Sequence, residues 1–132
     1  GGRMKRLSIV LCGIGSAALA DPIAVPSGQS IEFKQVIWAE EAETPNAIFR
    51  FVAPEITRDG TGIEYDTAAE DILFLCETFA LPRVLAANVG GEVGLVISLS
   101  QQDLAFGEAN PDILQFFDNF VVRDATCDWG DV

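Results

Sequence analysis

An N-terminal apolar run decides which part of this chain folds into a domain. Lys5 and Arg6 precede it, and residues 7–19 carry no charge and no proline. Ala18 and Ala20 form the small-x-small pattern that signal peptidase recognises, which places the cut before Asp21. A membrane span needs about 20 apolar residues, and this run is shorter. We therefore expect residues 4–20 to be a cleaved signal peptide, and residues 1–3 to lie upstream of the natural start.

Residues 21–132 are then expected to form one domain in the periplasm or outside the cell, without stable membrane insertion after cleavage. All 20 acidic residues lie at or after Asp21, whereas three of the eight basic residues lie before it. Five basic residues against 20 acidic ones give the exported part a formal charge of −15. Such a chain is repelled by nucleic acid and by anionic membranes. Nucleic-acid binding is excluded on this ground, and a basic periplasmic protein or a cationic ligand is the expected partner.

Two cysteines remain after cleavage, Cys76 and Cys127. In an oxidising compartment such a pair favours a structural disulfide. Two buried free thiols or a redox-active pair are the alternatives, although no Cys-x-x-Cys spacing supports redox chemistry. A bridge between these positions would contribute about 4 kcal/mol by limiting the unfolded chain.

The spacing of apolar residues predicts strands and helices in the order β-β-α-β-α-β. Residues 31–38 alternate in polarity, residues 47–52 follow a polar turn, and residues 93–100 are rich in β-branched side chains. A helix is predicted over residues 67–80, with Asp66 or Thr67 as N-cap and Pro82 ending it. A short helix is expected after Pro111, carrying Phe116 and Phe117, and a last strand over 120–123.

These elements predict an α+β fold, a two-layer sandwich in which helix 67–80 covers a mostly antiparallel sheet. Cys76 falls on the apolar stripe of that helix, so a bridge to Cys127 would fasten the helix to the C-terminal segment.

The absence of histidine excludes most hydrolytic triads and histidine metal sites. Lys34 is the one lysine after the signal peptide and lies on a predicted strand. Carboxylates remain, so a small hydrolase or lyase using Glu55, Glu64 or Asp66 is one alternative function. A calcium-binding domain using Asp59, Glu64 and Asp66 is another, although their spacing does not match an EF-hand. We expect no cofactor and no catalytic residue.

Aromatic residues give a weak indication of a partner surface. Trp38 and Trp129 are of a type enriched at binding hot spots, although tryptophan in a small domain more often packs in the core. Phe116, Phe117 and Phe120 cannot all face one side of a short helix, so one of them is expected to be exposed, and Phe117 is the candidate for a partner surface.

Several short stretches resemble one protein family. They are 51–56 (Phe-Val-Ala-Pro-Glu-Ile), 58–60 (Arg-Asp-Gly), 75–76 (Leu-Cys), 80–83 (Ala-Leu-Pro-Arg), 98–100 (Ser-Leu-Ser), 106–107 (Phe-Gly), 115–117 (Gln-Phe-Phe) and 127–129 (Cys-Asp-Trp). Together they resemble the DUF6497 group of small, exported, uncharacterised alphaproteobacterial proteins. The resemblance includes both cysteines, which supports the bridge, and implies no established activity. The leading expectation is therefore a non-catalytic binding or interaction module.

Overall fold

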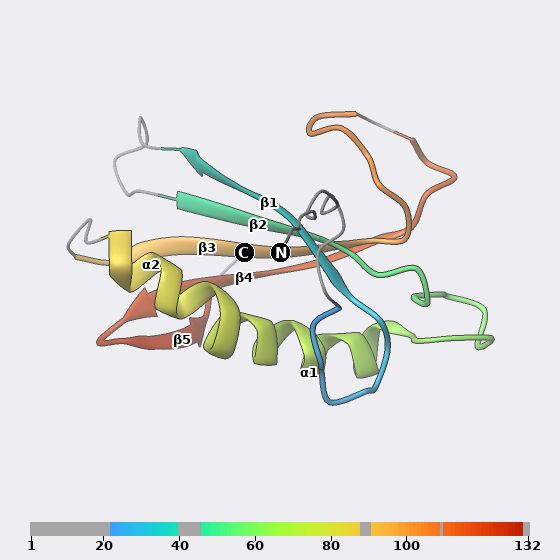
Figure 1. The fold of residues 1–132 in the computed structure, drawn as a ribbon, viewed down its shortest axis with the longest axis horizontal. Helices are drawn as coiled ribbons and strands as arrows, with labels where there is room; N and C mark the ends of the chain where they lie inside the picture. Colours follow the sequence, from blue (N-terminus) through green and yellow to red (C-terminus); the bar gives the residue numbers. More distant parts are fainter. Residues whose placement is uncertain (1–21, 40–45, 88–90, 109, 131–132) are drawn as a thin grey trace, which may run out of the picture.

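The computed structural model describes residues 22–39, 46–87, 91–108 and 110–130. A five-stranded sheet forms one layer, and a helical layer packs on one of its faces (Figure 1). The strands are β1 (Glu32–Ala39), β2 (Asn46–Val52), β3 (Val93–Ser100), β4 (Gln115–Arg123) and β5 (Thr126–Trp129). The helical layer is α1 (Tyr65–Leu75), the π-helical turn η2 (Cys76–Ala80) and α2 (Leu81–Ala87). The predicted α+β class is confirmed.

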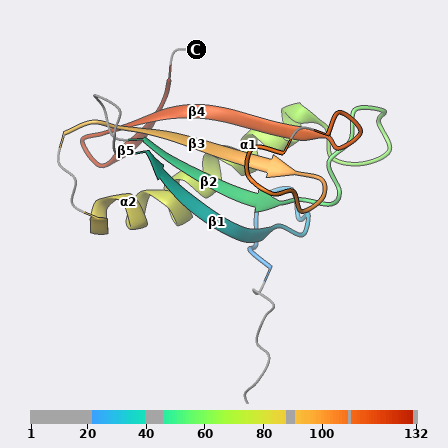
Figure 2. The ribbon, with the colours of Figure 1, turned by 90° about the horizontal axis from the view of Figure 1, so that it is seen from above.

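The sheet is mixed, with its strands in the order β1-β2-β3-β4-β5 (Figure 2). Three neighbouring pairs are antiparallel, but β2 and β3 in the centre are parallel. The prediction of a mostly antiparallel sheet missed this parallel pair. The connection between the two strands explains their parallel pairing, because β2 and β3 are joined through the whole helical layer. Such a crossover returns the chain to the end of the sheet where β2 began, so β3 runs in the same direction as β2.

Alternation along the strands places one set of apolar side chains against the helices. In β2 the buried residues are Ala47, Phe49 and Phe51, and the residues between them are half-buried. Phe33 of β1 and Phe79 of η2 join this core, with ring centroids 4.8 Å apart. Burial of these side chains is the main favourable contribution to folding. The other buried members of the core from the strands are Val93, Leu95, Ile97, Leu99, Phe116, Phe120 and Val122.

The short helix expected after Pro111 is wrong, because this segment leads into strand β4. Phe116 is buried and pairs with Leu99, whereas Phe117 pairs with Ser98 and is exposed. Neighbouring side chains of a strand point to opposite faces of the sheet, which accounts for the difference between these two residues. The predicted strand over 120–123 is the second half of β4.

The chain turns back after β4 and ends in β5, which was not predicted as a strand. Asp124 and Ala125 both have positive φ angles, 52° and 60°. Two such residues between antiparallel strands form the tight turn whose twist suits a hairpin. The observed order is therefore β-β-α-β-β-β rather than the predicted β-β-α-β-α-β.

The helical layer differs from the predicted helix at both ends. It begins at Tyr65, with Glu64 at the N-cap position and no side-chain cap, so capping by Asp66 or Thr67 is wrong. It continues past Pro82 to Ala87. Proline is tolerated there because it lies in the first turn of α2. The preceding turn η2 is π-helical, so its hydrogen bonds span five residues, as in the bond from Leu81 N–H to Cys76 O.

Two groups of polar contacts fasten the irregular segments to this frame. On the helical side, Ser27 and Gln29 donate to the buried carboxylate of Asp71 on α1. On the opposite side of the sheet, the connection between β3 and β4 folds back over the strands (Figure 1). Arg50 of β2 donates to Leu104 O in that connection, 2.7 Å away, and to Gln35 of β1.

Candidate functional site

The predicted cysteine pair is confirmed as a disulfide. Cys76 and Cys127 are bonded across 51 residues of sequence, with Cα atoms 6.3 Å apart. Cys76 is fully buried in η2, and Cys127 lies on β5 opposite Val122. The bridge thus ties the helical layer to the outermost strand. Cleavage at Ala18, Ala20 and Asp21 concerns residues outside those that the structure describes.

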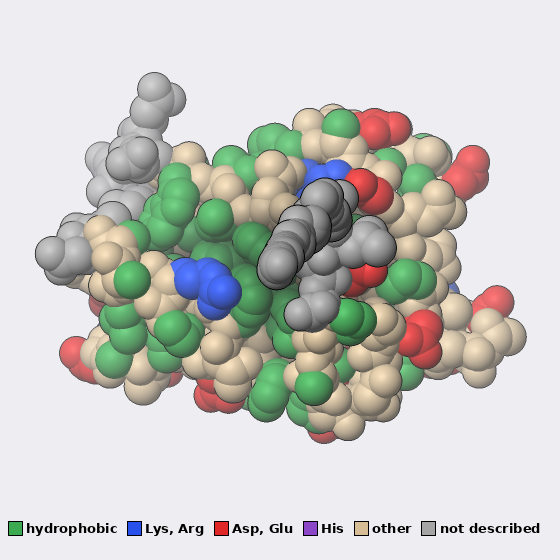
Figure 3. Space-filling view, in the orientation of Figure 1, with side chains coloured by type: hydrophobic (Ala, Val, Ile, Leu, Met, Phe, Trp, Pro, Cys, Tyr) green, Lys and Arg blue, Asp and Glu red, His purple; other side chains and the backbone are tan. Residues whose placement is uncertain are grey.

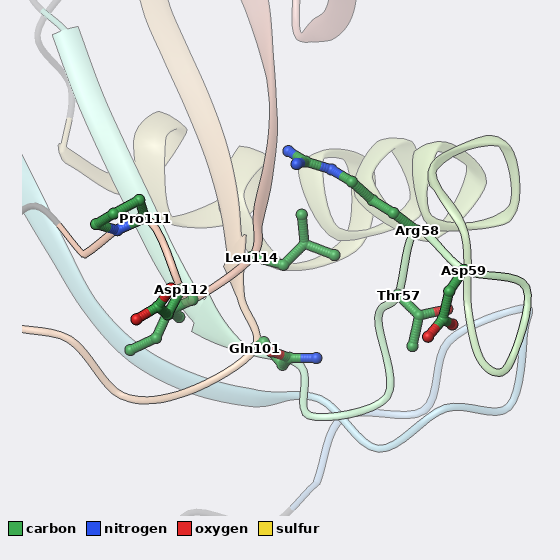
Figure 4. Close-up of a pocket in the computed structure, with 8 residues that line it drawn as sticks. Thr57, Arg58, Asp59, Gln101, Pro111, Asp112 and Leu114 are labelled. Atoms are coloured by element: carbon green, nitrogen blue, oxygen red, sulfur yellow. The ribbon is translucent and has the colours of Figure 1, made fainter.

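A hollow of about 290 Å³ lies at the end of the sheet where β2 and β3 finish (Figure 4). Residues 57–59 form one side and residues 111–114 the other, with Gln101 between them. Asp59 and Asp112 come from opposite sides, and their carboxylates do not converge (Figure 4). A pair of converging carboxylates, which acid-base hydrolysis requires, is therefore not formed in this hollow.

The carboxylates proposed for calcium or catalysis include two with hydrogen-bond partners in the neighbouring loops, Asp59 and Glu55. Asp59 accepts hydrogen bonds from the hydroxyl and backbone N–H of Thr61, which lower its pKa. Glu55 accepts from Ser30 N–H at 2.8 Å. Within the described ranges, Asp59, Glu64 and Asp66 do not gather with one another, or with other Cys, Asp or Glu side chains, into a group of three that could hold a metal ion.

A tyrosine-carboxylate pair was not anticipated from the sequence. Tyr65, at the start of α1, donates to Asp118 of β4 at 2.6 Å, and its ring meets Phe116 edge to face. The hydrogen bond to the Asp118 carboxylate, with partial burial, raises the pKa of Tyr65 to about 12. Such a phenol stays protonated at neutral pH, so it is a donor and not a base.

The three aromatic residues proposed for a partner surface do not share one surface. Phe117 is 59% exposed on the sheet face away from the helices. Trp129 is 54% exposed on β5 and stacks on Phe120 with centroids 4.7 Å apart. Trp38 is half-buried on β1, at the other edge of the sheet, and packs against the core.

A second hollow, of about 220 Å³, lies across β2, β3 and β4. It includes Gly94, Asn46 and Asn119, with Val96 and Val121 beside them, and no charged residue lines it. Its polar side chains are amides, which can bind by hydrogen bonding but provide no acid or base at neutral pH.

Apolar side chains lie on the helix-facing side of β1 and on α2. Trp38, Val36 and Phe33 alternate along β1 towards the helical layer and are only partly buried. On the helical side Leu81 is partly buried and Leu85 is 50% exposed. Figure 2 shows α2 on the side of the sheet where β1 forms the edge, near the end of β1. We call these five residues the β1–α2 surface.

The β1–α2 surface differs in charge from the chain around it. Hydrophobic side chains gather between β1 and α2, whereas Asp and Glu lie mostly in the right half and along the lower border of the view (Figure 3). Arg83 borders this surface, donating to Phe79 O and lying over the Phe79 ring, 3.5 Å from its centroid. A contiguous apolar patch with a polar border is typical of an interaction site.

The family profile of DUF6497, a family of unknown function, matches residues 10–132. The chain belongs to the DUF6497 family. No curated protein and no solved structure matches it. Within the residues described for this DUF6497 member, every helix is too short or too polar to cross a bilayer.

Proposed function

We propose that this DUF6497 protein is an exported, non-catalytic interaction module that binds a partner protein on its β1–α2 surface. The proposal is supported by the exposure of Leu85 on α2 and the partial exposure of Trp38 on β1, in a chain that is otherwise strongly acidic. Burying a leucine side chain contributes about 1.5–3 kcal/mol. A partner that covers both residues therefore gains a substantial part of its affinity from this surface.

The charge of the chain supports a basic partner. With five basic residues against 20 acidic ones after Asp21, long-range attraction favours positively charged proteins and speeds their encounter. The salt dependence of binding distinguishes the apolar contact from the electrostatic attraction. Salt weakens the second far more than the first.

The test uses purified, disulfide-bonded protein beginning at Asp21, immobilised and exposed to periplasmic extract at low salt. We expect wild-type protein to retain a basic partner that salt releases. Leu85→Ser should lose most of this partner, whereas Trp129→Ser should keep it, because Trp129 is equally exposed but lies on β5. Retention that is indifferent to Leu85→Ser, or no salt-released partner, would contradict the proposal.

A further inference from the structure

The outer edge of β1 is unpaired among the described residues. β1 is the first strand in the sheet order and pairs only with β2. No backbone hydrogen bond joins residues 33–39 to any described segment other than β2. An edge strand exposes a row of N–H and C=O groups that can accept another strand.

Natural proteins protect such edges with charge, proline or bulges, and here that protection is confined to the start of β1. Glu32 and Lys34 are charged, Lys34 pairs with Asp103, and the register shifts between Phe33 and Gln35. From Gln35 to Ala39 the strand carries no charge and no proline. The unprotected part is the C-terminal part of β1.

We propose that an extended segment of the partner protein pairs its backbone with residues 35–39 of β1, adding a sixth strand to the sheet. This inference rests on the proposed function, since it specifies how the partner occupies the β1–α2 surface. Strand addition supplies affinity through main-chain hydrogen bonds and specificity through alternate side chains. Those on the helical side would contact Val36 and Trp38.

The dimensions and charge define the chemistry of the segment. An added strand lies about 4.8 Å from β1 and rises about 3.3 Å per residue, so about five residues cover the unprotected length. Every second residue faces the helical side and should be apolar. Positions outside this stretch should be Lys or Arg, because the chain carries a formal charge of −15 after Asp21.

A second copy of this chain fits the edge less well than a basic partner segment. Two-fold pairing of β1 with β1 would bring together two strongly acidic chains, whose repulsion opposes association. The experiment below distinguishes such a dimer from binding of a partner segment.

The experiment begins with seven-residue peptides selected from a random display library on the disulfide-bonded protein. The selected peptide is compared with the same sequence carrying N-methyl groups on alternate backbone amides, made in both registers. Methylation in the pairing register removes two or three hydrogen bonds while leaving every side chain unchanged. Loss of these hydrogen bonds should weaken binding by at least about tenfold.

Amide hydrogen exchange locates the binding. We expect the peptide to slow exchange of amides within residues 35–39 by about tenfold or more, with amides of β5 unchanged. Equal binding of both methylated peptides, unchanged exchange in β1, or failure to select any peptide would overturn strand addition. A wild-type dimer whose β1 amides are already protected without peptide would overturn it as well.

The two proposals fail in different ways. If a salt-released partner depends on Leu85 but the peptides do not protect β1, docking stands and strand addition is wrong. If the peptides protect β1 but Leu85→Ser changes neither partner capture nor peptide affinity, the edge binds strands while the β1–α2 surface is not the docking site.

Discussion

Asp71 accepts hydrogen bonds from both the backbone N–H and the hydroxyl of Ser27, at 2.9 and 2.5 Å. The two residues are 44 positions apart in the sequence. Gln29 adds a third donor at 2.7 Å, and the Asp71 side chain is fully buried. This cluster holds the segment before β1 against α1, and so fixes the direction from which β1 enters the sheet.

Asp71→Ala should therefore destabilise the fold although no apolar contact is lost. Three donors would be left without their acceptor in a buried position, which costs about 2–3 kcal/mol in the free energy of unfolding. Urea unfolding measures this loss. Asp66→Ala is the matched control, because Asp66 is exposed in the first turn of the same helix and should cost less than about 1 kcal/mol. Equal effects of the two substitutions would contradict the role of the cluster.

Removal of the disulfide should loosen β5 before the rest of the sheet. The double variant Cys76→Ala, Cys127→Ala frees a loop closed across 51 residues, with an expected cost of about 4 kcal/mol. Amides of Thr126–Trp129 should exchange fastest, since this strand has four residues and pairs only with β4. Exchange that rises uniformly over all five strands would show that the bridge does not act locally.

The single tyrosine of the chain allows a direct titration. Ultraviolet absorbance of the phenolate should give a pKa of about 12 for Tyr65, and Asp118→Asn should return it towards 10.0. The unfolded tyrosine ionises near 10 while the folded one keeps its proton. The contribution of this hydrogen bond is therefore complete below pH 10 and is lost as the pH rises to about 12. A wild-type midpoint near 10 would rule out the pair in solution.

Export gives a fourth prediction. Protein isolated from the periplasm should have the mass of a chain that begins at Asp21, and alkylation without reduction should leave that mass unchanged because no thiol is free. A retained N-terminal segment would indicate an anchored protein. Two alkylated cysteines would reopen the redox alternative.

Much of the fold could be predicted from the sequence because its periodicity is strong in the first three strands. The segment around Phe116 and Phe120 was ambiguous, since a spacing of four fits both a helix face and alternate strand positions. β5 has four residues, too few to show a period. The parallel pairing of β2 and β3 could have been inferred, because strands joined through a helix are usually parallel.

The candidate site was only partly visible in the sequence. Trp38 and the cysteine pair were identified by residue type, but Leu85 was missed because Pro82 was expected to end the helix. The π-helical turn before Pro82, which contains the disulfide-bonded Cys76, has no sequence pattern of its own. Tyr65 and Asp118 are 53 positions apart, and only the completed sheet brings them together.

The most direct test of the account is photocrosslinking in living cells of the native host. A photoreactive phenylalanine analogue is placed at Leu85 in one strain and at Trp129 in another, two positions of similar exposure on different elements. We expect a discrete crosslinked partner from position 85 and none from position 129. No crosslink from position 85, or the same products from both positions, would contradict it.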